Sequence, residues 1–364
     1  MRLLFITQKV DLDDDILGVY HDWISGVAKN LEQVSVICLY RGRVNLPENV
    51  VVGSLGKEQL VGQSLVGLNR FLQRLRYLVR FYSLVWRWRN EYDVVFVHMN
   101  PEYVVLAGLF WKLFHKKIIL WYAHYLANFK LRVAAALADR IMTSTRLAYP
   151  LDSKKLVVLQ QGIDTEMFKS AANKKISPQF KILWLGRFAP VKNLEILLAA
   201  FAEVARRLPQ ATLTIIGGPT AGKSIEAAYY KKISNLVNQI GLADRIVFWA
   251  PVPHSQTPDI YRDHDLFINL TDTGSFDKTT LEAMACGVPV LVSNRAFAEL
   301  FSNTTPELLC KEKDLRDLAD KILAIQALSI AQRRTLGEKL RQLIIQHHDL
   351  RQLTKRLADI IRQI

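Results

Sequence analysis

The sequence predicts an α/β protein with two Rossmann-like domains whose parallel sheets face each other across a cleft. Short apolar runs alternate with helix-period segments in both halves of the chain, which is typical of parallel sheets covered by helices on both faces. The length of 364 residues also favours two cores over one. Polar residues and Pro178 interrupt the alternation midway. We therefore expect domains at 1–165 and 166–341, and a C-terminal helix at 342–364 that packs back toward the first domain.

Each half has its own set of apolar runs that predict strands. In the first half they are 2–7, 34–40, 93–98, 117–124, 140–145 and 156–161. In the second half they are 181–186, 212–218, 245–250, 266–270 and 288–293. Ligands of doubly wound sheets bind beyond the carboxyl ends of the strands, so the residues that follow these runs are the candidates for a site in the cleft.

Composition narrows the class of protein and its partners. The net charge of +14 makes nucleic acid, anionic lipid and phosphorylated substrates candidate partners. Cys38, Cys286 and Cys310 match no metal-ligand spacing, and we expect buried thiols in a reducing cytosol. No apolar run reaches the roughly 18 residues that span a bilayer, and the start of the chain predicts a strand in place of a signal peptide. We therefore expect a cytoplasmic protein.

The stretch 271–294 carries the strongest chemical signal. It predicts a strand end, a glycine-containing turn, a short helix entered through 279–282, and a buried strand. Backbone N–H groups at such a helix start bind phosphate, because they lack partners and carry the positive end of the helix dipole. Glu282, in the first turn, could accept both hydroxyls of a ribose. This combination predicts a nucleotide-linked substrate.

Two cations follow the first strand of the second domain. Arg187 comes directly after Gly186, and Lys192 follows at the start of the next helix. Converging on one point, these cations would hold a diphosphate and stabilise it as a leaving group. The alternative is a solvated pair flanking a loop, which the second phosphate-binding helix start in the same domain disfavours.

Several motifs occur in the order found in one known family. They are QGID (161–164), LGRFAPVKNLEILLAAFAEV (185–204), IIGGP (215–219), RIVFWAPVPHSQTPDIYRDHDLFINL (245–270) and EAMACGVPVLVSN (282–294). With them, the sequence resembles the donor domain of GT-B fold retaining glycosyltransferases, in particular family 4, the glycosyl transferases group 1. The resemblance implies a nucleotide diphosphate sugar as substrate and no separate cofactor. It also implies no metal, since the related enzymes use basic residues and helix dipoles.

The resemblance also assigns roles to residues. Arg187 and Lys192 would grip the donor diphosphate, and Glu282 would bind the ribose. The amides of Thr280 and Leu281 would complete the phosphate cradle. The donor-binding residues expected on this basis are Gly18, Arg187, Lys192, Gly218, Gly274, Ser275, Lys278, Thr280, Leu281 and Glu282.

The sequence departs from the family pattern at one position. The family carries two glutamates with seven residues between them, and Gly274 stands where the first would be. Asp277 is the nearest carboxylate that could contact the donor sugar, with Lys278 beside it. Alternatively, Asp277 is an N-cap that accepts the amides of Thr279 or Thr280. The missing glutamate leaves the donor sugar open and allows for an impaired enzyme.

In the first domain, His98 and His124 each end a predicted strand. The resemblance places His124 where the family has a histidine near the sugar and the leaving group. His98 is a candidate for contact with the acceptor or the sugar, although a structural role is equally compatible. Gly18 aligns with a loop that meets the donor phosphates. The expected catalytic residues are therefore His124, Arg187, Lys192 and Asp277.

An acidic loop precedes Gly18. Its carboxylates are Asp11, Asp13, Asp14 and Asp15. They raise the possibility of a metal site, but we expect a solvated loop without a metal.

The basic charge is concentrated at 59–90, which contains no Asp or Glu. At about 100° per residue, one face of this predicted helix is apolar and would pack on the domain. That face consists of Leu68, Phe71, Leu72, Leu75, Val79, Tyr82 and Trp86. The outward face would mix Arg74, Arg80 and Arg87 with Phe81 and Trp88, which suits an anionic membrane. A solvated basic helix is the alternative; RNA binding fits less well, because no nucleic-acid module is recognisable.

Together these observations predict a retaining, metal-independent, hexosyltransferase-like glycosyltransferase. It would act at the inner face of the cell membrane on a lipid-linked or cell-envelope glycan acceptor. Two alternatives remain: a nucleotide-sugar epimerase of the same fold, and a non-catalytic glycan- or membrane-binding relative. A dehydrogenase is disfavoured, because no Gly-x-Gly-x-x-Gly follows the first strand.

Overall fold

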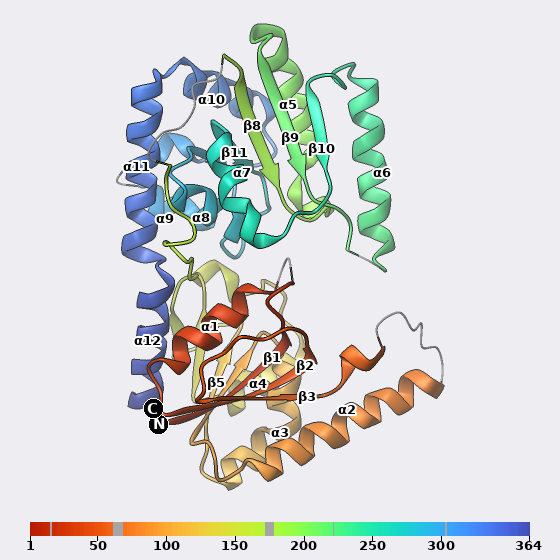
Figure 1. The fold of residues 1–364 in the computed structure, drawn as a ribbon, viewed down its shortest axis with the longest axis vertical. Coiled ribbons are helices and arrows are strands. Elements are labelled where there is room, and N and C mark those ends of the chain that lie inside the picture. The colour runs from red at the N-terminus through yellow and green to blue at the C-terminus, as the bar shows by residue number, and fades with distance from the viewer. Residues whose placement is uncertain (15–16, 61–67, 172–177, 221, 303) are drawn as a thin grey trace. The chain divides into compact units, whose positions relative to one another are not determined.

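The computed structural model describes residues 1–14, 17–60, 68–171, 178–220, 222–302 and 304–364. The chain forms two compact units, and each contains one parallel sheet (Figure 1). Met1–Gly162 and Leu350–Ile364 form the first unit, and Ile163–Asp349 forms the second. The first boundary lies close to the predicted one, whereas the returning segment begins at Leu350 rather than at 342. Two parallel-sheet Rossmann-like domains, as predicted, are therefore confirmed.

The sheet of the first unit has the strand order β3-β2-β1-β4-β5-β6-β7. Its strands are β1 (Arg2–Val10), β2 (Gln33–Arg41), β3 (Val50–Ser54), β4 (Val94–His98), β5 (Lys117–Trp121), β6 (Arg140–Thr143) and β7 (Leu156–Val158). Sequence reasoning missed β3. This strand lies at the edge of the sheet and is partly exposed, and its run of three valines ends at Gly53 and Ser54, so it is shorter than the runs that predict the buried strands.

Helices cover both faces of this sheet. They are α1 (Val19–Ala28), α2 (Leu68–Arg87), α3 (Pro101–Leu113), α4 (Phe129–Leu137) and α12 (Leu350–Gln363), with short 3-10 turns η1 (Lys57–Leu60) and η2 (Arg146–Ala148). Because side chains alternate along a strand, β1 sends Phe5 to the face covered by α1 and α12, and Ile6 to the opposite face. The C-terminal helix α12 packs against α1, which ties the end of the chain to the first unit.

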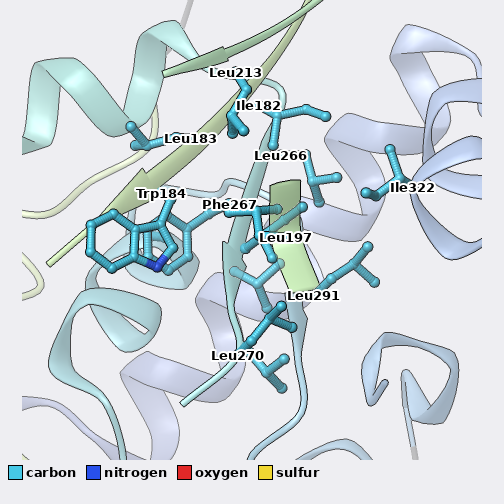
Figure 2. Packing of buried hydrophobic residues seen from close by; sticks show 14 of the residues in the cluster. Ile182, Leu183, Trp184, Leu197, Leu213, Leu266, Phe267, Leu270, Leu291 and Ile322 are labelled. Atoms are coloured by element: carbon cyan, nitrogen blue, oxygen red, sulfur yellow. The ribbon is translucent and has the colours of Figure 1, made fainter. Parts of the chain in front are cut away.

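The second unit has the strand order β10-β9-β8-β11-β12. Its strands are β8 (Phe180–Leu185), β9 (Ala211–Ile216), β10 (Ile246–Trp249), β11 (Leu266–Asn269) and β12 (Val290–Val292). Every strand predicted here is present. Figure 2 shows how Ile182, Leu266 and Leu291, from three neighbouring strands, pack into one buried apolar cluster with Leu197 and Ile322 of the covering helices.

The helices of the second unit follow the strands in turn. They are α5 (Leu194–Arg207), α6 (Ser224–Gln239), α7 (Thr257–Asp263), α8 (Lys278–Ala285), α9 (Ala298–Phe301), α10 (Leu315–Ala327) and α11 (Ile330–His347). The 3-10 turns are η3 (Pro190–Lys192), η4 (His254–Gln256), η5 (Arg295–Phe297) and η6 (Pro306–Leu308). Ser329 and Gln332 form a capping box that starts α11.

Each sheet has one place where the strand order reverses. In the first unit it lies between β1 and β4, and in the second between β8 and β11. The loops that leave two such strands run to opposite faces of the sheet and open a crevice between them, where ligands of this fold class bind. The crevice of the second unit therefore lies beside the segments after Leu185 and Asn269.

Helix α2 is oriented opposite to the prediction. The apolar side chains expected to pack on the domain, from Leu68 to Trp86, are exposed, whereas Phe81 and Trp88 are buried. Phe81 packs on Tyr103 of α3, with ring centroids 5.0 Å apart. The helix has two apolar faces, and the pattern alone favoured the longer one. Only the shorter face, at the C-terminal half, lies where the sheet and α3 can cover it.

The basic side chains of α2 face outward, as predicted. Arg74, Arg80 and Arg87 are all exposed, and Arg80 also donates to the carbonyl oxygen of Leu55 at 3.0 Å. Phe81 and Trp88 cannot form part of a surface. The five residues predicted to lie together on an outward face are therefore divided between solvent and core.

The three cysteines are buried, as expected. Burial raises the pKa of Cys38, Cys286 and Cys310 to about 12 in each case, so these thiols stay protonated and unreactive near neutral pH. Among the described residues, no helix is long and apolar enough to cross a membrane.

Candidate functional site

The crevice of the second unit holds a largely shielded ion pair. Lys192, at the end of η3 after β8, places Nζ 2.6 Å from Oδ1 of Asp277, which precedes α8. The same ammonium donates to Oγ1 of Thr271 at 2.9 Å. Both charged side chains are largely shielded from solvent. The loops that leave the two strands at the reversal point are thus joined by one cation, whose third N–H remains for a ligand.

A second contact reinforces this junction. Asn193 has a left-handed backbone conformation, with φ of 51°. Its side-chain amide donates to the carbonyl oxygen of Leu270 at 2.8 Å and to Asp272 at 2.8 Å. The turn after Lys192 is therefore fixed to the loop after β11, which limits the positions available to the Lys192 ammonium.

Asp277 does not cap α8 with its side chain. It occupies the N-cap position as predicted, but the predicted side-chain capping hydrogen bond is absent, and its carboxylate contacts Lys192 instead. Its backbone carbonyl accepts from the amides of Thr280 and Leu281 at 3.2 and 3.3 Å. These are the two amides expected to form the phosphate cradle, and their contact with a phosphate stays a prediction. The helix begins early enough that both already belong to its first internal hydrogen bonds.

Arg187 has a carboxylate partner that sequence reasoning missed. Its Nη1 lies 3.3 Å from Oε1 of Glu226, which also accepts from the Lys223 ammonium at 3.1 Å. The other oxygen, Oε2, accepts from the amide of Thr220 at 2.8 Å. Burial alone would raise the pKa of Glu226, but the hydrogen bonds from Thr220 and Lys223 and the charge of Arg187 outweigh it, and the pKa is lowered. Glu226 therefore stays ionised and holds Arg187.

One feature of the sequence points to Glu226. It stands in the first turn of α6, soon after the glycine-rich strand end IIGGP. A carboxylate at a helix start usually serves the helix itself, so its position alone gave no reason to pair it with Arg187.

Glu282 is buried and already has two partners. His254 Nε2 lies 2.9 Å from Oε1, and the hydroxyl of Tyr261 donates to Oε2 at 2.9 Å. Burial and the Glu282 charge raise the pKa of Tyr261, so it remains a donor. Both partners lie in the motif at 245–270, but nothing in the sequence linked them to Glu282. A ribose would have to use the remaining lone pairs of this carboxylate, and that contact stays a prediction.

The turn that carries Gly274 and Ser275 is held by Asn294. The Asn294 side-chain oxygen accepts from the amide of Gly274 at 3.3 Å and from that of Ala296 at 2.9 Å. Its Nδ2 donates to the carbonyl oxygen of Ser275 at 2.7 Å. A Cβ atom added at Gly274 would meet no described heavy atom within 4 Å. A Cβ atom therefore fits where the family has its first glutamate.

The remaining predicted donor residues lie close by in the fold. Gly218 follows β9, next to β8, and its carbonyl oxygen accepts from the amide of Phe188 at 3.2 Å. Lys278 is the first residue of α8, directly after Asp277. The second unit thus brings Arg187, Lys192, Gly218 and the 274–282 segment to one edge of its sheet.

In the first unit, His98 is the last residue of β4, and His124 follows the adjacent strand β5. His98 is buried, with Nδ1 3.3 Å from Oγ1 of Thr7 and its ring 4.0 Å from that of Tyr20. His124 is half-buried, and its Nδ1 accepts from the amide of Leu126 at 3.1 Å. This hydrogen bond puts the proton of the neutral ring on Nε2, which leaves that nitrogen as a donor.

The acidic loop is paired rather than solvated, which corrects the expectation. Lys9 Nζ lies 3.0 Å from Asp11 and 2.6 Å from Asp14, and Arg43 binds Asp13 at 2.6 Å. Asp15 lies outside the described residues. No group of three His, Cys, Asp or Glu in the described part of the chain could hold a metal ion.

Gly18 precedes α1 at the end of this loop, and its amide donates to the carbonyl oxygen of Asp14 at 3.1 Å. An added Cβ would lie 2.6 Å from that oxygen, so close backbone approach explains this glycine. Contact of Gly18 with donor phosphates stays a prediction.

Two doubly wound parallel-sheet units, with cations at the reversal point of the second, define the GT-B class of fold. Residues 179–327 match the sequence model of the family glycosyl transferases group 1. The predicted resemblance to this family is therefore confirmed, and the match covers the sheet and helices that carry Arg187, Lys192 and Glu282.

Curated relatives share this part of the chain. D-inositol 3-phosphate glycosyltransferase of Segniliparus rotundus is 32% identical over 171 residues, which are 43% of this chain and 37% of that protein. Mannosylfructose-phosphate synthase of Agrobacterium fabrum is 31% identical over 153 residues, which are 40% of this chain and 34% of that protein. The matched segment thus spans well under half the length of these relatives.

Solved structures match the whole chain in fold. Sucrose-phosphate synthase from Thermosynechococcus elongatus has a TM-score of 0.80 at 18% identity, covering 100% of this chain and 98% of that one. HepE from Anabaena, in complex with UDP and glucose, has a TM-score of 0.77 at 18% identity, with 100% of both chains covered. At this identity the likeness shows the fold alone.

Proposed function

We propose that this protein is a glycosyltransferase that moves a sugar from a nucleotide diphosphate sugar to an acceptor hydroxyl. The observation that carries the proposal is the pair of cations, Arg187 and Lys192, at the sheet edge of the second unit. Each keeps N–H donors beyond those used by Glu226 and Asp277, so each can bind a phosphate oxygen without losing its carboxylate. The names of the relatives and the UDP complex of HepE support this class of substrate.

The reaction proceeds with retention of configuration and without a metal. The bond between the anomeric carbon and the diphosphate oxygen breaks, and Arg187 and Lys192 stabilise the charge that develops on the diphosphate. The acceptor oxygen bonds to the anomeric carbon on the same face, while its proton passes to the departing diphosphate oxygen. His124 donates from Nε2 to orient the sugar, and Asp277 contacts the sugar in place of the absent glutamate. Retention is inferred from the family resemblance.

The acceptor is a lipid-linked or cell-envelope glycan, and the protein works in the cytoplasm at the inner face of the membrane. The net charge of +14 and the acid-free, arginine-rich helix α2 support an anionic membrane partner. Nucleic acid is the less suitable partner, because the arginines are interleaved with apolar side chains and no nucleic-acid module is recognisable.

The first experiment measures binding of UDP, GDP, ADP and TDP by titration calorimetry. We expect one of them to bind at micromolar Kd and the affinity to fall at least about tenfold in Arg187→Ala, since a charge-assisted hydrogen bond to phosphate is lost. The matched control is Lys232→Ala, which removes a surface cation of the same unit that pairs with Glu195. Loss of binding in the control as well would contradict the assignment.

An assay of donor turnover distinguishes the transferase from the epimerase and from the non-catalytic relative. Incubation of the donor with membrane lipid extract should release nucleoside diphosphate and label a glycan or lipid. A changed sugar without any acceptor would identify the epimerase. Binding of a nucleoside diphosphate without any turnover would identify the non-catalytic relative, to which the glycine at 274 would then be relevant.

A further inference from the structure

The first unit carries an apolar surface made from the outer faces of α2 and α3. On α2 it consists of Leu68, Phe71, Leu72, Leu75, Val79, Tyr82 and Trp86, and on α3 of Leu106, Leu109 and Leu113. Leu68 is 72% exposed, Val79 62% and Leu113 75%. We call this set the α2–α3 surface. Its α2 residues are the ones that the sequence pattern had assigned to the core.

The two helices present one continuous surface. The Tyr82 hydroxyl donates to the carbonyl oxygen of Leu106 at 2.9 Å. The ring of Trp86 lies 6.0 Å from that of Phe110 and 6.0 Å from that of Phe114. Figure 1 shows the N-terminal half of α2 extending beyond the sheet of the first unit. With 20 residues at about 1.5 Å each, the helix presents a stripe roughly 30 Å long.

Isolated exposed apolar side chains are ordinary, but a contiguous stripe of this length is not. The core of the unit is already filled by the shorter face of α2, through Phe81 and Val85. The exposed stripe is therefore not part of the core, and its exposure to water costs free energy. A partner that covers the stripe accounts for its apolar composition.

The charge beside the stripe identifies that partner. At about 100° per residue, Arg76 and Arg87 flank one side of the stripe and Arg74 flanks the other. Helix α2 contains no Asp or Glu. Two carboxylates in and near the neighbouring helices are already paired, Glu102 of α3 with Lys130 and Asp139, which precedes β6, with Lys112. The surface is thus an apolar stripe with cationic margins.

A second copy of the chain fits these charges poorly. The spacing of Leu68, Leu72, Leu75, Val79, Tyr82 and Trp86 also suits a coiled-coil seam. Two α2 helices packed on that seam would bring the flanking arginines together with no acidic residue on either helix to neutralise them. A bilayer of anionic lipid supplies both an apolar interior and negative headgroups.

We infer that the α2–α3 surface is where the protein docks on a membrane, with the apolar stripe inserted between anionic lipid headgroups. The arginines at its margins extend their side chains to the phosphates, and Arg89, whose guanidinium lies 4.3 Å from the centre of the Trp86 ring, holds that indole at the interface. The inference rests on the membrane part of the proposed function. The sequence had predicted that Phe81 and Trp88 face the membrane. In the present inference the exposed residues of α2 and α3 take that place.

Vesicle sedimentation of the full chain tests this. The probes are vesicles of phosphatidylcholine alone and vesicles containing phosphatidylglycerol. We expect binding to the second kind, and at least about a tenfold lower partition coefficient for the double variant Leu75→Glu, Val79→Glu, because two inserted apolar groups become charged. The matched control is Ile330→Glu, an exposed isoleucine of α11 in the other unit, which should bind vesicles like the unchanged protein.

Two outcomes would overturn the inference. One is equal vesicle binding by the double variant and the unchanged protein, or no binding by either. The other is a dimer of the unchanged protein that becomes a monomer in the double variant, which would make a second copy the occupant. Because α2 and α3 lie outside the nucleotide-binding unit, titration with the nucleoside diphosphates separates this result from failure of the proposed function. The double variant should retain the nucleotide affinity of the unchanged protein.

Discussion

Lys192 and Asp277 form a 2.6 Å ion pair that joins the loop after β8 to the loop after β11. Neither residue could perform its expected role alone. The carboxylate fixes the ammonium at the reversal point of the sheet, beside the place where a diphosphate would bind. A phosphate site built in this way is positioned before its ligand arrives, so less ordering is needed on binding.

Removing Lys192 and removing the charge of Asp277 should have opposite effects on nucleotide binding. We expect Lys192→Ala to lower the affinity for the nucleoside diphosphate by about 10- to 100-fold, the worth of a charge-assisted hydrogen bond. Asp277→Asn should tighten the same affinity, because a negative charge near the phosphates is lost. Calorimetry checks both. Weaker binding in Asp277→Asn would show that fixing the ammonium matters more than the repulsion.

Glu226 should act through Arg187. In Glu226→Gln the ion pair is lost while the shape is kept, so we expect KM for the donor to rise about fivefold to tenfold with kcat nearly unchanged. Steady-state kinetics with varied donor measures the split. A parallel fall in kcat would instead give Glu226 a part in the chemical step. Lys232→Ala again provides a control for a general change in surface charge.

Substitutions of Glu282 and of Tyr261 should affect stability and nucleotide binding differently. Tyr261→Phe removes one donor to the buried carboxylate, so we expect the free energy of unfolding to fall by about 1 kcal/mol with nucleotide affinity nearly kept. Glu282→Ala should weaken donor binding strongly and also destabilise the unit, since the buried Tyr261 hydroxyl loses its acceptor. Denaturant unfolding and calorimetry on both variants check this. Undiminished donor affinity in Glu282→Ala would remove its assignment to the ribose.

Gly274→Glu should fold normally. An added Cβ meets no described atom within 4 Å, so we expect the Tm and the nucleotide affinity to stay as they are, while turnover of the donor sugar rises. The matched control is Gly217→Ala, at φ of 139° with its Cβ only 1.9 Å from the carbonyl oxygen of Gly186, and this variant should be destabilised. A Gly274→Glu protein that loses nucleotide binding would contradict the open geometry of the turn.

Asp139 should make the first unit sensitive to acid. Burial would raise its pKa, but hydrogen bonds from Lys112 and the amide of Ile118 outweigh burial and lower it. A lowered carboxyl pKa contributes stability above the unfolded pKa of about 3.9, and this contribution is lost as pH falls through the folded pKa. We expect Asp139→Asn to cost about 1–2 kcal/mol at neutral pH and almost nothing below that folded pKa. Denaturant unfolding at both pH values measures the difference, and an equal cost at both would exclude the charge as its source.

The sequence by itself determined the order of the buried strands, though not the edge strand β3, and the sheet edges where chemistry could occur. Apolar runs such as KILWLG mark strands because a parallel strand is buried on both faces, and the positions after them are fixed by chain order alone. That was enough to find Arg187, Lys192 and Asp277, and to predict that they serve one site.

Only the tertiary structure decided which partner each side chain meets and which face of a helix is covered. Glu226, His254 and Asn294 act on residues 20 or more positions away, and no local pattern reports such contacts. Helix α2 has two apolar faces, and its own periodicity favoured the longer. The sheet and α3 cover the shorter one, because packing depends on what the neighbouring elements leave open, and that is a property of the whole fold.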